Sequence, residues 1–257
     1  MLDLAYIEFS EDRATRPPLI IAHGIFGAGR NWRALAKRMG EGRRVLAVDM
    51  RNHGESPWSD EHDYPAMASD LAALIEAEGG RAAVLGHSMG GKAVMALAET
   101  RPDLLERLIV ADIAPVAYSH DLHAEIEAMR AVDLTGLSRR AEVETALAAR
   151  IEAPAMRSFL AQSAVLGAAP RWSFNLDALA ANMKAVIGYP DLGGVYEGPV
   201  LMLHGGASDY VSPSHHAEIF KRFPAVKFQA LEGAGHWLHA DQPRVFLNAA
   251  NAFLAEG

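Results

Sequence analysis

Short apolar runs alternate with helical patterns in the first part of the chain. Each run has the length of a buried strand and is followed by a polar or glycine-rich turn. The apolar runs lie at residues 18–22, 45–48, 82–85 and 108–111, and the helical patterns lie at 32–39, 67–78 and 92–99. This alternation predicts crossover units, which build a parallel sheet with helices on both faces. The looser alternation of residues 2–9 predicts an edge strand.

The pattern changes between residues 117 and 198. Strand-like runs give way there to Ala, Glu, Arg, Leu and Met, which favour helices over 122–131, 139–152 and 155–165. Apolar runs return at 199–203 and 226–231, and a helical pattern covers 243–254. We therefore expect a core formed by residues 1–116 and 199–257, and a helical cap, or lid, formed by 117–198. The alternative is that the helices of 117–198 are ordinary crossover helices of the sheet.

The composition limits the class of protein. The net charge is −8 at pH 7, which gives no basic excess of the kind that binds nucleic acid. No apolar run is long enough to span a membrane, and residues 1–4 lack the basic start and apolar core of a signal peptide. The lack of cysteine excludes disulfides, thiolate metal ligands and a cysteine nucleophile. We expect a cytoplasmic monomer or homodimer without nucleic-acid or membrane partners.

The sequence GHSMG at residues 86–90 stands between an apolar strand and a helical pattern. The glycines on either side allow a strand-to-helix turn that is too tight for side chains at their positions. Such a turn lifts the Ser88 hydroxyl clear of the sheet and toward the helix N-terminus, where backbone N–H groups point at a developing anion. The alternative is a glycine-rich turn that contains a serine by chance.

A serine nucleophile needs a general base, and the base needs a third group to orient it. His236 follows the last predicted strand in a glycine-flanked loop, which can bring its imidazole over the sheet edge where Ser88 lies. We assign His236 as the base; the alternative is a buried structural histidine. His87 should point away from the Ser88 hydroxyl across so sharp a turn, and His239 should only shape the loop.

Two aspartates are candidates for the orienting acid. Asp209 ends the penultimate strand and Asp112 ends the strand after the GHSMG turn. Both give the chain order serine, aspartate, histidine that is typical of this arrangement. Both can reach the same imidazole from neighbouring strand ends, so the residues alone leave the choice open. The unused aspartate would be a loop-capping carboxylate.

The oxyanion hole needs two backbone N–H groups. We expect one from Met89 and the other from the loop at residues 23–27, from Ile25 first and Phe26 next. Five aromatic side chains are candidates for pocket walls, although each is also a normal packing residue of a core or cap: Phe26, Tyr118, Trp172, Phe174 and Tyr210.

With these residues placed, the chain resembles the α/β-hydrolase superfamily from end to end. The motifs that carry the resemblance are HGIFG at 23–27, DMRNHGES at 49–56, GHSMGG at 86–91, GGASD at 205–209 and GAGHW at 233–237. A finer resemblance, to the small esterases grouped with bacterial YbfF and the mammalian ABHD11-type hydrolases, rests on VDMRNHGESP, GHSMGGK, VADIAP, NLDAL, SPSHH and GAGHWLHADQP.

The resemblance implies the α/β-hydrolase fold, a mostly parallel twisted sheet flanked by helices, with a small helical cap between the sixth and seventh core strands. It implies an acyl-ester hydrolase with Ser88 as nucleophile and His236 as base. In these relatives the acid follows the strand after the nucleophile, which favours Asp112. Some of them lack an aspartate at the position of Asp209, which this chain keeps, so Asp209 remains the alternative acid.

We therefore expect a carboxylesterase-type serine hydrolase that cleaves a small-molecule short-acyl ester, or a thioester, through an acyl-enzyme. The mechanism requires no cofactor and no metal. A carbon–carbon bond hydrolase or a cofactor-free perhydrolase can use the same triad, and a non-catalytic ligand-binding receptor can use the same scaffold. Dehalogenase and epoxide hydrolase chemistry is disfavoured, because those relatives have an aspartate where Ser88 stands. The first glycine loop lacks the spacing of a nucleotide-binding oxidoreductase.

Overall fold

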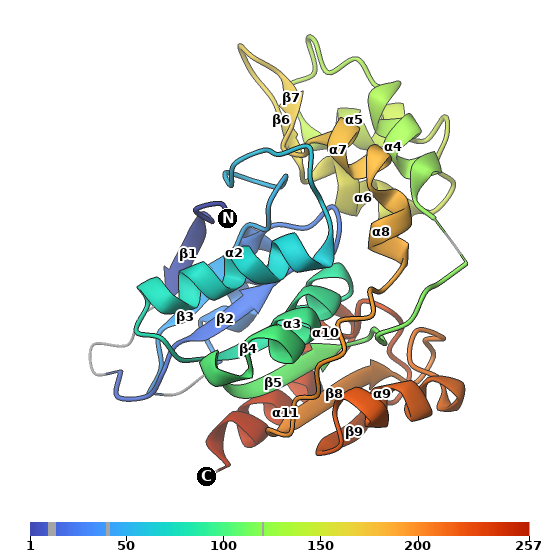
Figure 1. The fold of residues 1–257 in the computed structure, drawn as a ribbon. Helices are drawn as coiled ribbons and strands as arrows, with labels where there is room; N and C mark the ends of the chain where they lie inside the picture. The colour runs from blue at the N-terminus through green and yellow to red at the C-terminus, as the bar shows by residue number, and fades with distance from the viewer. Residues whose placement is uncertain (10–13, 40–41, 120, 257) are drawn as a thin grey trace.

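The computed structural model describes residues 1–9, 14–39, 42–119 and 121–256. Its main feature is a seven-stranded sheet in the order β1-β3-β2-β4-β5-β8-β9 (Figure 1). β1 is antiparallel to β3, and the other neighbouring strands are parallel, which confirms the mostly parallel sheet that the sequence predicts. The strands are β1 (Tyr6–Phe9), β2 (Leu19–Ala22), β3 (Val45–Val48), β4 (Ala82–His87), β5 (Leu105–Ala111), β8 (Val200–Gly205) and β9 (Val226–Leu231).

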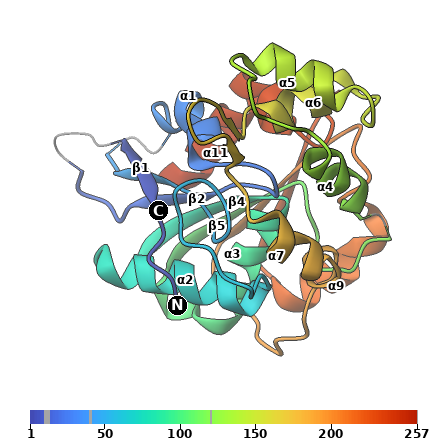
Figure 2. The ribbon, with the colours of Figure 1, turned by 90° about the horizontal axis from the view of Figure 1, so that it is seen from above.

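Helices cover both faces of the sheet, because the strand side chains alternate between two apolar cores. In β2, Ile20 belongs to one core, whereas Leu19 and Ile21 belong to the other. The first core includes residues of α2 (Tyr64–Ala77), α3 (Met89–Thr100) and α9 (His216–Arg222). The second includes residues of α1 (Arg33–Ala36), α10 (Leu238–Asp241) and α11 (Pro243–Ala255). Figure 2 shows α2 and α3 on one side of the sheet and α1 and α11 on the other.

Local capping sets where the helices begin. Asp63 accepts a hydrogen bond from the Ala66 N–H at 2.9 Å, and Pro65 lies in the first turn, so α2 begins before the predicted residue 67. The predicted helix over 32–39 is a 3-10 turn (Gly29–Trp32) followed by α1. Two more 3-10 turns are Pro102–Leu104 and Pro213–His215.

The segment between β5 and β8 forms a separate group of short helices beyond the sheet (Figure 1). In the described residues it follows the fifth strand of the sheet in chain order, not the sixth as predicted, because a single strand, β1, precedes the first parallel strand, β2. The predicted helix over 155–165 ends early, and the chain then enters a hairpin. The elements are α4 (His123–Arg130), α5 (Arg140–Leu147), α6 (Pro154–Ala161), β6 (Ala164–Val165), β7 (Arg171–Trp172), α7 (Leu176–Ala181) and α8 (Met183–Ile187).

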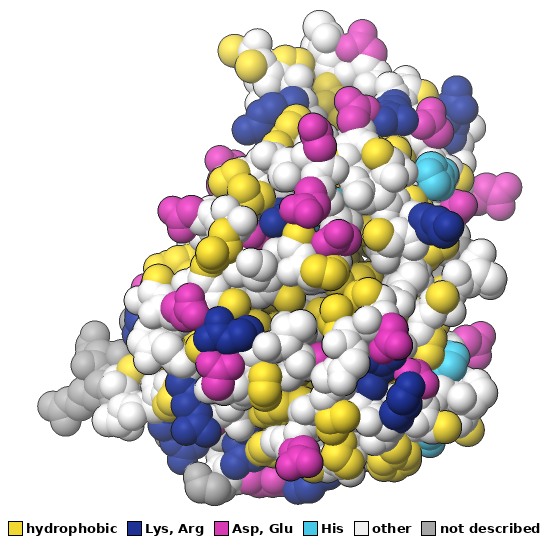
Figure 3. All heavy atoms as spheres, viewed as in Figure 1, with side chains coloured by type: hydrophobic (Ala, Val, Ile, Leu, Met, Phe, Trp, Pro, Cys, Tyr) yellow, Lys and Arg dark blue, Asp and Glu magenta, His cyan; other side chains and the backbone are white. Residues whose placement is uncertain are grey.

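The molecular surface carries charges of both signs. Acidic and basic side chains are interspersed on the face seen in Figure 3. Some of them pair, as Arg44 does with Glu8 at 2.7 Å and with Glu78 at 2.6 Å. Among the helices of the described ranges, none combines the length and the apolar character that crossing a membrane requires.

Candidate active site

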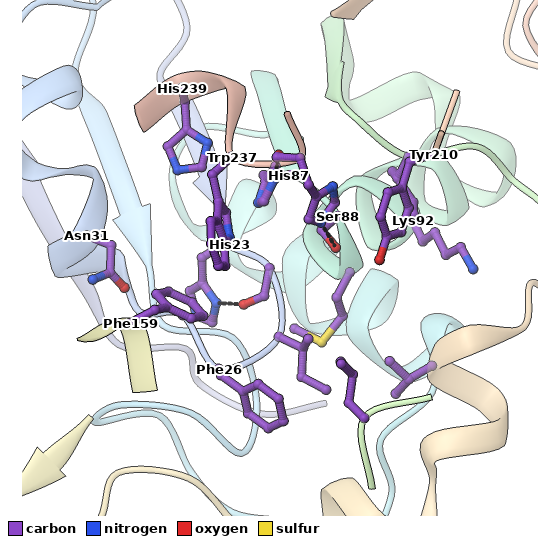
Figure 4. Close-up of a pocket in the computed structure, with 18 of the residues that line it drawn as sticks. His23, Phe26, Asn31, His87, Ser88, Lys92, Phe159, Tyr210, Trp237 and His239 are labelled. Atoms are coloured by element: carbon purple, nitrogen blue, oxygen red, sulfur yellow. Dashed lines mark hydrogen bonds between the residues drawn. The ribbon is translucent and has the colours of Figure 1, made fainter. Parts of the chain in front are cut away.

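Ser88 occupies a strained turn between β4 and α3. Its backbone has φ 53° and ψ −120°, a conformation that residues other than glycine rarely adopt. A Cβ on Gly86 would collide with the backbone carbonyl of Gly90, and a Cβ on Gly90 would collide with that of Ala22. Glycine at both positions therefore lets α3 begin directly against the sheet. The Ser88 side chain faces the cavity (Figure 4).

The imidazole of His236 lies between the side chains of Ser88 and Asp112. Its Nε2 is 3.1 Å from Ser88 Oγ, and its Nδ1 is 2.8 Å from Asp112 Oδ2. A proton on Nδ1 donates to the carboxylate, which leaves the Nε2 lone pair facing the serine hydroxyl. The His236 ring also stacks on Tyr210, with centroids 4.0 Å apart. The three polar side chains thus form one hydrogen-bonded chain.

Of the two candidate acids, Asp112 is the one that contacts His236. Asp112 is fully buried and has a φ of 53°. Its Oδ1 accepts from the Gly205 N–H at 2.9 Å, and its Oδ2 accepts from the Ser208 hydroxyl at 2.5 Å as well as from His236. Asp209 is exposed in the loop after β8. Ser208 is a site residue that the sequence did not predict, although its place in this loop beside Asp209 was a usable signal.

Two more histidines support the loop that carries His236. The Nε2–H of His87 donates to the backbone carbonyl of His236 at 2.9 Å, so this side chain holds the loop. His239 stacks on Trp32 with ring centroids 4.5 Å apart. Burial lowers the pKa of His87 well below its usual value and the pKa of His239 to about 4. Both rings are therefore neutral at pH 7, His87 as a hydrogen-bonding group and His239 as a packing group.

The loop after β2 forms a tight turn over residues 24–27. The Gly27 N–H donates to the Gly24 carbonyl at 2.9 Å, and Phe26 has a positive φ of 61° whereas Ile25 does not, which is the pattern of a type II turn. The Phe26 N–H donates to His53 Nε2 at 3.2 Å. Within the described ranges, the N–H groups of Ile25 and Met89 donate no hydrogen bond. These two remain available for an oxyanion, and that of Phe26 does not.

Ile25→Pro tests this donor with little change to the turn. Position i+1 of a type II turn accepts proline readily, so the substitution removes one N–H group and keeps the backbone path. Loss of one oxyanion donor lowers kcat by roughly 10²- to 10³-fold in a known case, and we expect a similar loss here. The kcat for p-nitrophenyl acetate measures it, and Ile25→Ala serves as the control. Equal rates for the two variants would contradict the assignment.

Ser88 lines a cavity of about 890 Å³, part of it open to solvent. The cavity lies between the sheet and the segment from β5 to β8, here called the inserted segment. Phe26, Tyr118 and Tyr210 line it, as three of the five predicted wall residues. The Tyr118 hydroxyl donates to the Tyr210 carbonyl at 2.7 Å, which holds this side of the cavity together. A largely apolar cavity that contains a serine hydroxyl is typical of a site for a small organic molecule.

The other two predicted wall residues, Trp172 and Phe174, lie outside this cavity. The Trp172 indole N–H donates to the Met129 carbonyl at 2.9 Å inside the inserted segment. Phe174 packs behind Phe26, with ring centroids 5.7 Å apart. Both side chains are buried in the first apolar core, which continues from the sheet into the inserted segment. Aromatic character alone could not distinguish this role from a pocket wall.

The sequence matches a known family over most of its length. Residues 19–250 match the Alpha/beta hydrolase family. The chain belongs to this family. It is 42% identical to the sn-1-specific diacylglycerol lipase ABHD11 of Mus musculus, over 99% of this chain and 86% of that protein.

Two further comparisons extend this result for the hydrolase. The chain is 34% identical to the esterase YbfF of Escherichia coli (strain K12), over 95% of this chain and 96% of that protein. Its fold matches the solved structure of a marine microorganism esterase with a TM-score of 0.92 and 34% identity, over 98% of this chain and 100% of that one. The family, the α/β-hydrolase fold and the class of carboxylesterase-type hydrolases are thereby confirmed.

A buried lysine joins the hydrolase core to the inserted segment. Lys92 lies in α3, one helical turn after Ser88, and is 1% exposed. Its Nζ donates to the carbonyls of Ile187 at 2.9 Å and Gly188 at 2.6 Å, where the chain leaves α8. Figure 4 shows its amino group directed away from Ser88. Burial lowers the pKa of Lys92 to about 7.

Lys92→Met should remove a pH dependence of stability. The pKa of lysine is near 10.4 in an unfolded chain and about 7 for Lys92 in the fold, so the unfolded state binds more protons between these values. The free energy of unfolding should therefore rise with pH over this window. From about pH 7 to 9.5 we expect the rise to be about 1–3 kcal/mol larger in the wild type than in Lys92→Met, by urea denaturation. A constant difference between the two proteins would rule this out.

Proposed function

We propose that this hydrolase cleaves short-acyl carboxylic esters through an acyl-enzyme formed on Ser88, with His236 as general base and Asp112 as the residue that orients it. The observation that carries the proposal is the hydrogen-bonded chain from Ser88 Oγ through His236 to the buried Asp112 carboxylate. The names of the relatives, a diacylglycerol lipase and two esterases, support carboxylic esters as the substrate class.

The geometry supports a two-step acyl transfer. Ser88 Oγ attacks the ester carbonyl carbon while His236 Nε2 takes the hydroxyl proton, and the N–H groups of Ile25 and Met89 donate to the tetrahedral oxyanion. Collapse of this intermediate breaks the bond to the alkoxy oxygen, which receives the proton from His236 and leaves as the alcohol. A water molecule then repeats the sequence on the acyl-enzyme and releases the carboxylic acid.

The test of this proposal is direct detection of the acyl-enzyme. We expect p-nitrophenyl acetate to give a burst of p-nitrophenolate of about one equivalent per active site where deacylation is the slower step, or an acetylated Ser88 peptide in acid-quenched samples. A burst of p-nitrophenolate without acetyl on Ser88 would contradict the mechanism. Steady hydrolysis with acetyl on another residue would contradict the choice of nucleophile.

We further propose that residues 117–198 act as a cap that limits the length of the acyl chain. Hydrogen bonds join this segment to the core along the cavity wall: Tyr64 Oη donates to the Val186 carbonyl at 2.5 Å, and Lys92 donates to the next two carbonyls. These bonds fix this wall of the cavity in place, so we expect it not to yield to a longer acyl chain. Across p-nitrophenyl esters with acyl chains of two to sixteen carbons, we expect the highest kcat/KM for the short ones. A maximum at the long end would contradict this assignment.

A further inference from the structure

The tight turn over residues 24–27, here called the oxyanion turn, is hydrogen-bonded to a histidine that takes no part in the acyl transfer. His53 lies in the loop after β3 and is fully buried. Its Nδ1 donates to the Arg51 carbonyl at 2.9 Å, which places the proton on Nδ1 and leaves Nε2 as an acceptor. That acceptor receives the Phe26 N–H at 3.2 Å. The side chain therefore has one defined tautomer, and its Nε2 lone pair accepts the hydrogen bond from the turn.

The two peptide groups on either side of Ile25 are both held by histidines. In a trans peptide the C=O and the following N–H point in opposite directions. The Gly24 carbonyl accepts from His23 Nδ1 at 2.8 Å, which directs the Ile25 N–H of the same peptide the other way. The next peptide carries the Phe26 N–H, which His53 holds. Rotation of the first peptide would turn the Ile25 N–H away, and displacement of the second would move the Ile25 Cα to which that nitrogen is bonded.

The backbone of Phe26 has a conformation that needs the hydrogen bond to His53 to stabilise it. The third position of a type II turn needs a positive φ and usually holds glycine, yet this chain has phenylalanine there with φ 61°. Such a backbone persists in a residue other than glycine only where its surroundings hold it. The bond from the Phe26 N–H to His53 is the contact of the described structure that holds this peptide.

His53 also joins the turn to the inserted segment. Its backbone forms a β-bridge with Phe174, and the two rings meet edge to face at 5.2 Å. The neighbouring Gly54 N–H donates to the Ser173 carbonyl at 2.8 Å. Phe174 in turn packs on Phe26. One imidazole thus contacts both the oxyanion turn and the segment above the cavity.

Resting on the proposed function, we propose that His53 is a positioning residue of the oxyanion hole: it anchors the Ile25–Phe26 peptide and thereby fixes the position of the turn that carries the Ile25 N–H. Phe174 keeps its ring in place from the inserted segment. The acceptor stays available at working pH, since burial, together with the adjacent His23, lowers the pKa of His53 to about 3. Protonation of His53 would place an N–H on Nε2, which could then no longer accept the hydrogen bond from the Phe26 N–H.

The test compares His53→Leu, which removes the acceptor, with His53→Gln, whose side-chain oxygen can replace Nε2. His62→Gln is the matched control, because His62 is also buried and packs against His53 at 5.7 Å but does not contact the turn. For each variant, kcat and KM for p-nitrophenyl acetate are measured together with the Ki of a trifluoromethyl ketone. This inhibitor adds to Ser88 and places an oxyanion in the hole.

We expect His53→Leu to lower kcat by about 10- to 100-fold with KM within about twofold, because small displacements of a catalytic group cost this much. The Ki of the ketone should rise by a similar factor. His53→Gln should recover most of the loss, and His62→Gln should stay within about threefold of the wild type. If His53→Leu fails to fold, His53→Ala takes its place, because it also removes the acceptor, and its kcat and ketone Ki must change together.

Three results would overturn the inference: a folded His53→Leu enzyme with wild-type kcat, a loss confined to KM, or a fall in kcat that leaves the ketone Ki unchanged. Ser88→Ala separates this failure from failure of the proposed function. If Ser88→Ala is inactive while His53→Leu is fully active, only the role of His53 is lost. If Ser88→Ala retains full activity, the acyl-enzyme mechanism itself is wrong.

Discussion

Ser88→Ala should lower kcat for p-nitrophenyl acetate by about 10⁵- to 10⁶-fold, the size of the loss in a serine hydrolase of another fold. Without the hydroxyl, His236 has no proton to accept and no acyl-enzyme can form. The N–H groups of Ile25 and Met89 remain, so a residual acceleration of roughly 10³-fold over the reaction in water should persist. KM should change little, because alanine removes one oxygen atom from the cavity wall.

Ser208→Ala is the matched control for this prediction. Its hydroxyl lies in the same site and donates to Asp112 at 2.5 Å, but it does not contact Ser88. We expect a loss of about tenfold or less, since Asp112 keeps its bonds to Gly205 and His236. A fluorophosphonate should add one phosphonyl group to the wild type and to Ser208→Ala, and none to Ser88→Ala. Equal losses of kcat in Ser88→Ala and Ser208→Ala would contradict the assignment of Ser88 as the nucleophile.

Much of the sheet could be predicted from the sequence, because its strands are continuous apolar runs. β2, β3 and β4 are buried at every residue, so neither face shows the polar alternation that would blur the pattern. The elements of the inserted segment were harder to predict from the sequence. Residues 155–165 are helical by propensity, yet the helix ends at Ala161 and β6 begins at Ala164, where the chain pairs with β7. That pairing is a tertiary contact, and helix propensity does not record it.

The candidate site shows the same division. Ser88 stands in a motif whose glycines have a local steric reason, so its neighbourhood could be predicted from adjacent residues. His236 could be predicted because its loop follows the last strand of the sheet. The choice between Asp112 and Asp209 could not, because both follow strand ends at one edge of the sheet. What distinguishes them is burial, and burial depends on the whole fold. The same reason hid His53, whose partner in the oxyanion turn is 27 residues earlier in the chain.

Asp112→Asn should lower kcat/KM by about 10⁴-fold, whereas Asp209→Asn should stay within about twofold of the wild type. Oδ2 of Asp112 accepts from both His236 Nδ1 and the Ser208 hydroxyl. An asparagine amide that turns its NH₂ toward His236 requires an acceptor at Nδ1. The imidazole proton then moves to Nε2, which can no longer take the proton of Ser88.

Asp112→Asn and Asp209→Asn each remove one negative charge, so a difference between their rates reports the position of the carboxylate and not its charge. Asp209 is exposed, and its loss changes only a solvated carboxylate. Asp112 is fully buried with three donors directed at it, so its loss changes the tautomer of His236. Steady-state kinetics on p-nitrophenyl acetate from pH 6 to 9 measure both variants. A larger loss in Asp209→Asn than in Asp112→Asn would mean that the loop after β8 rearranges during turnover and supplies the acid from Asp209.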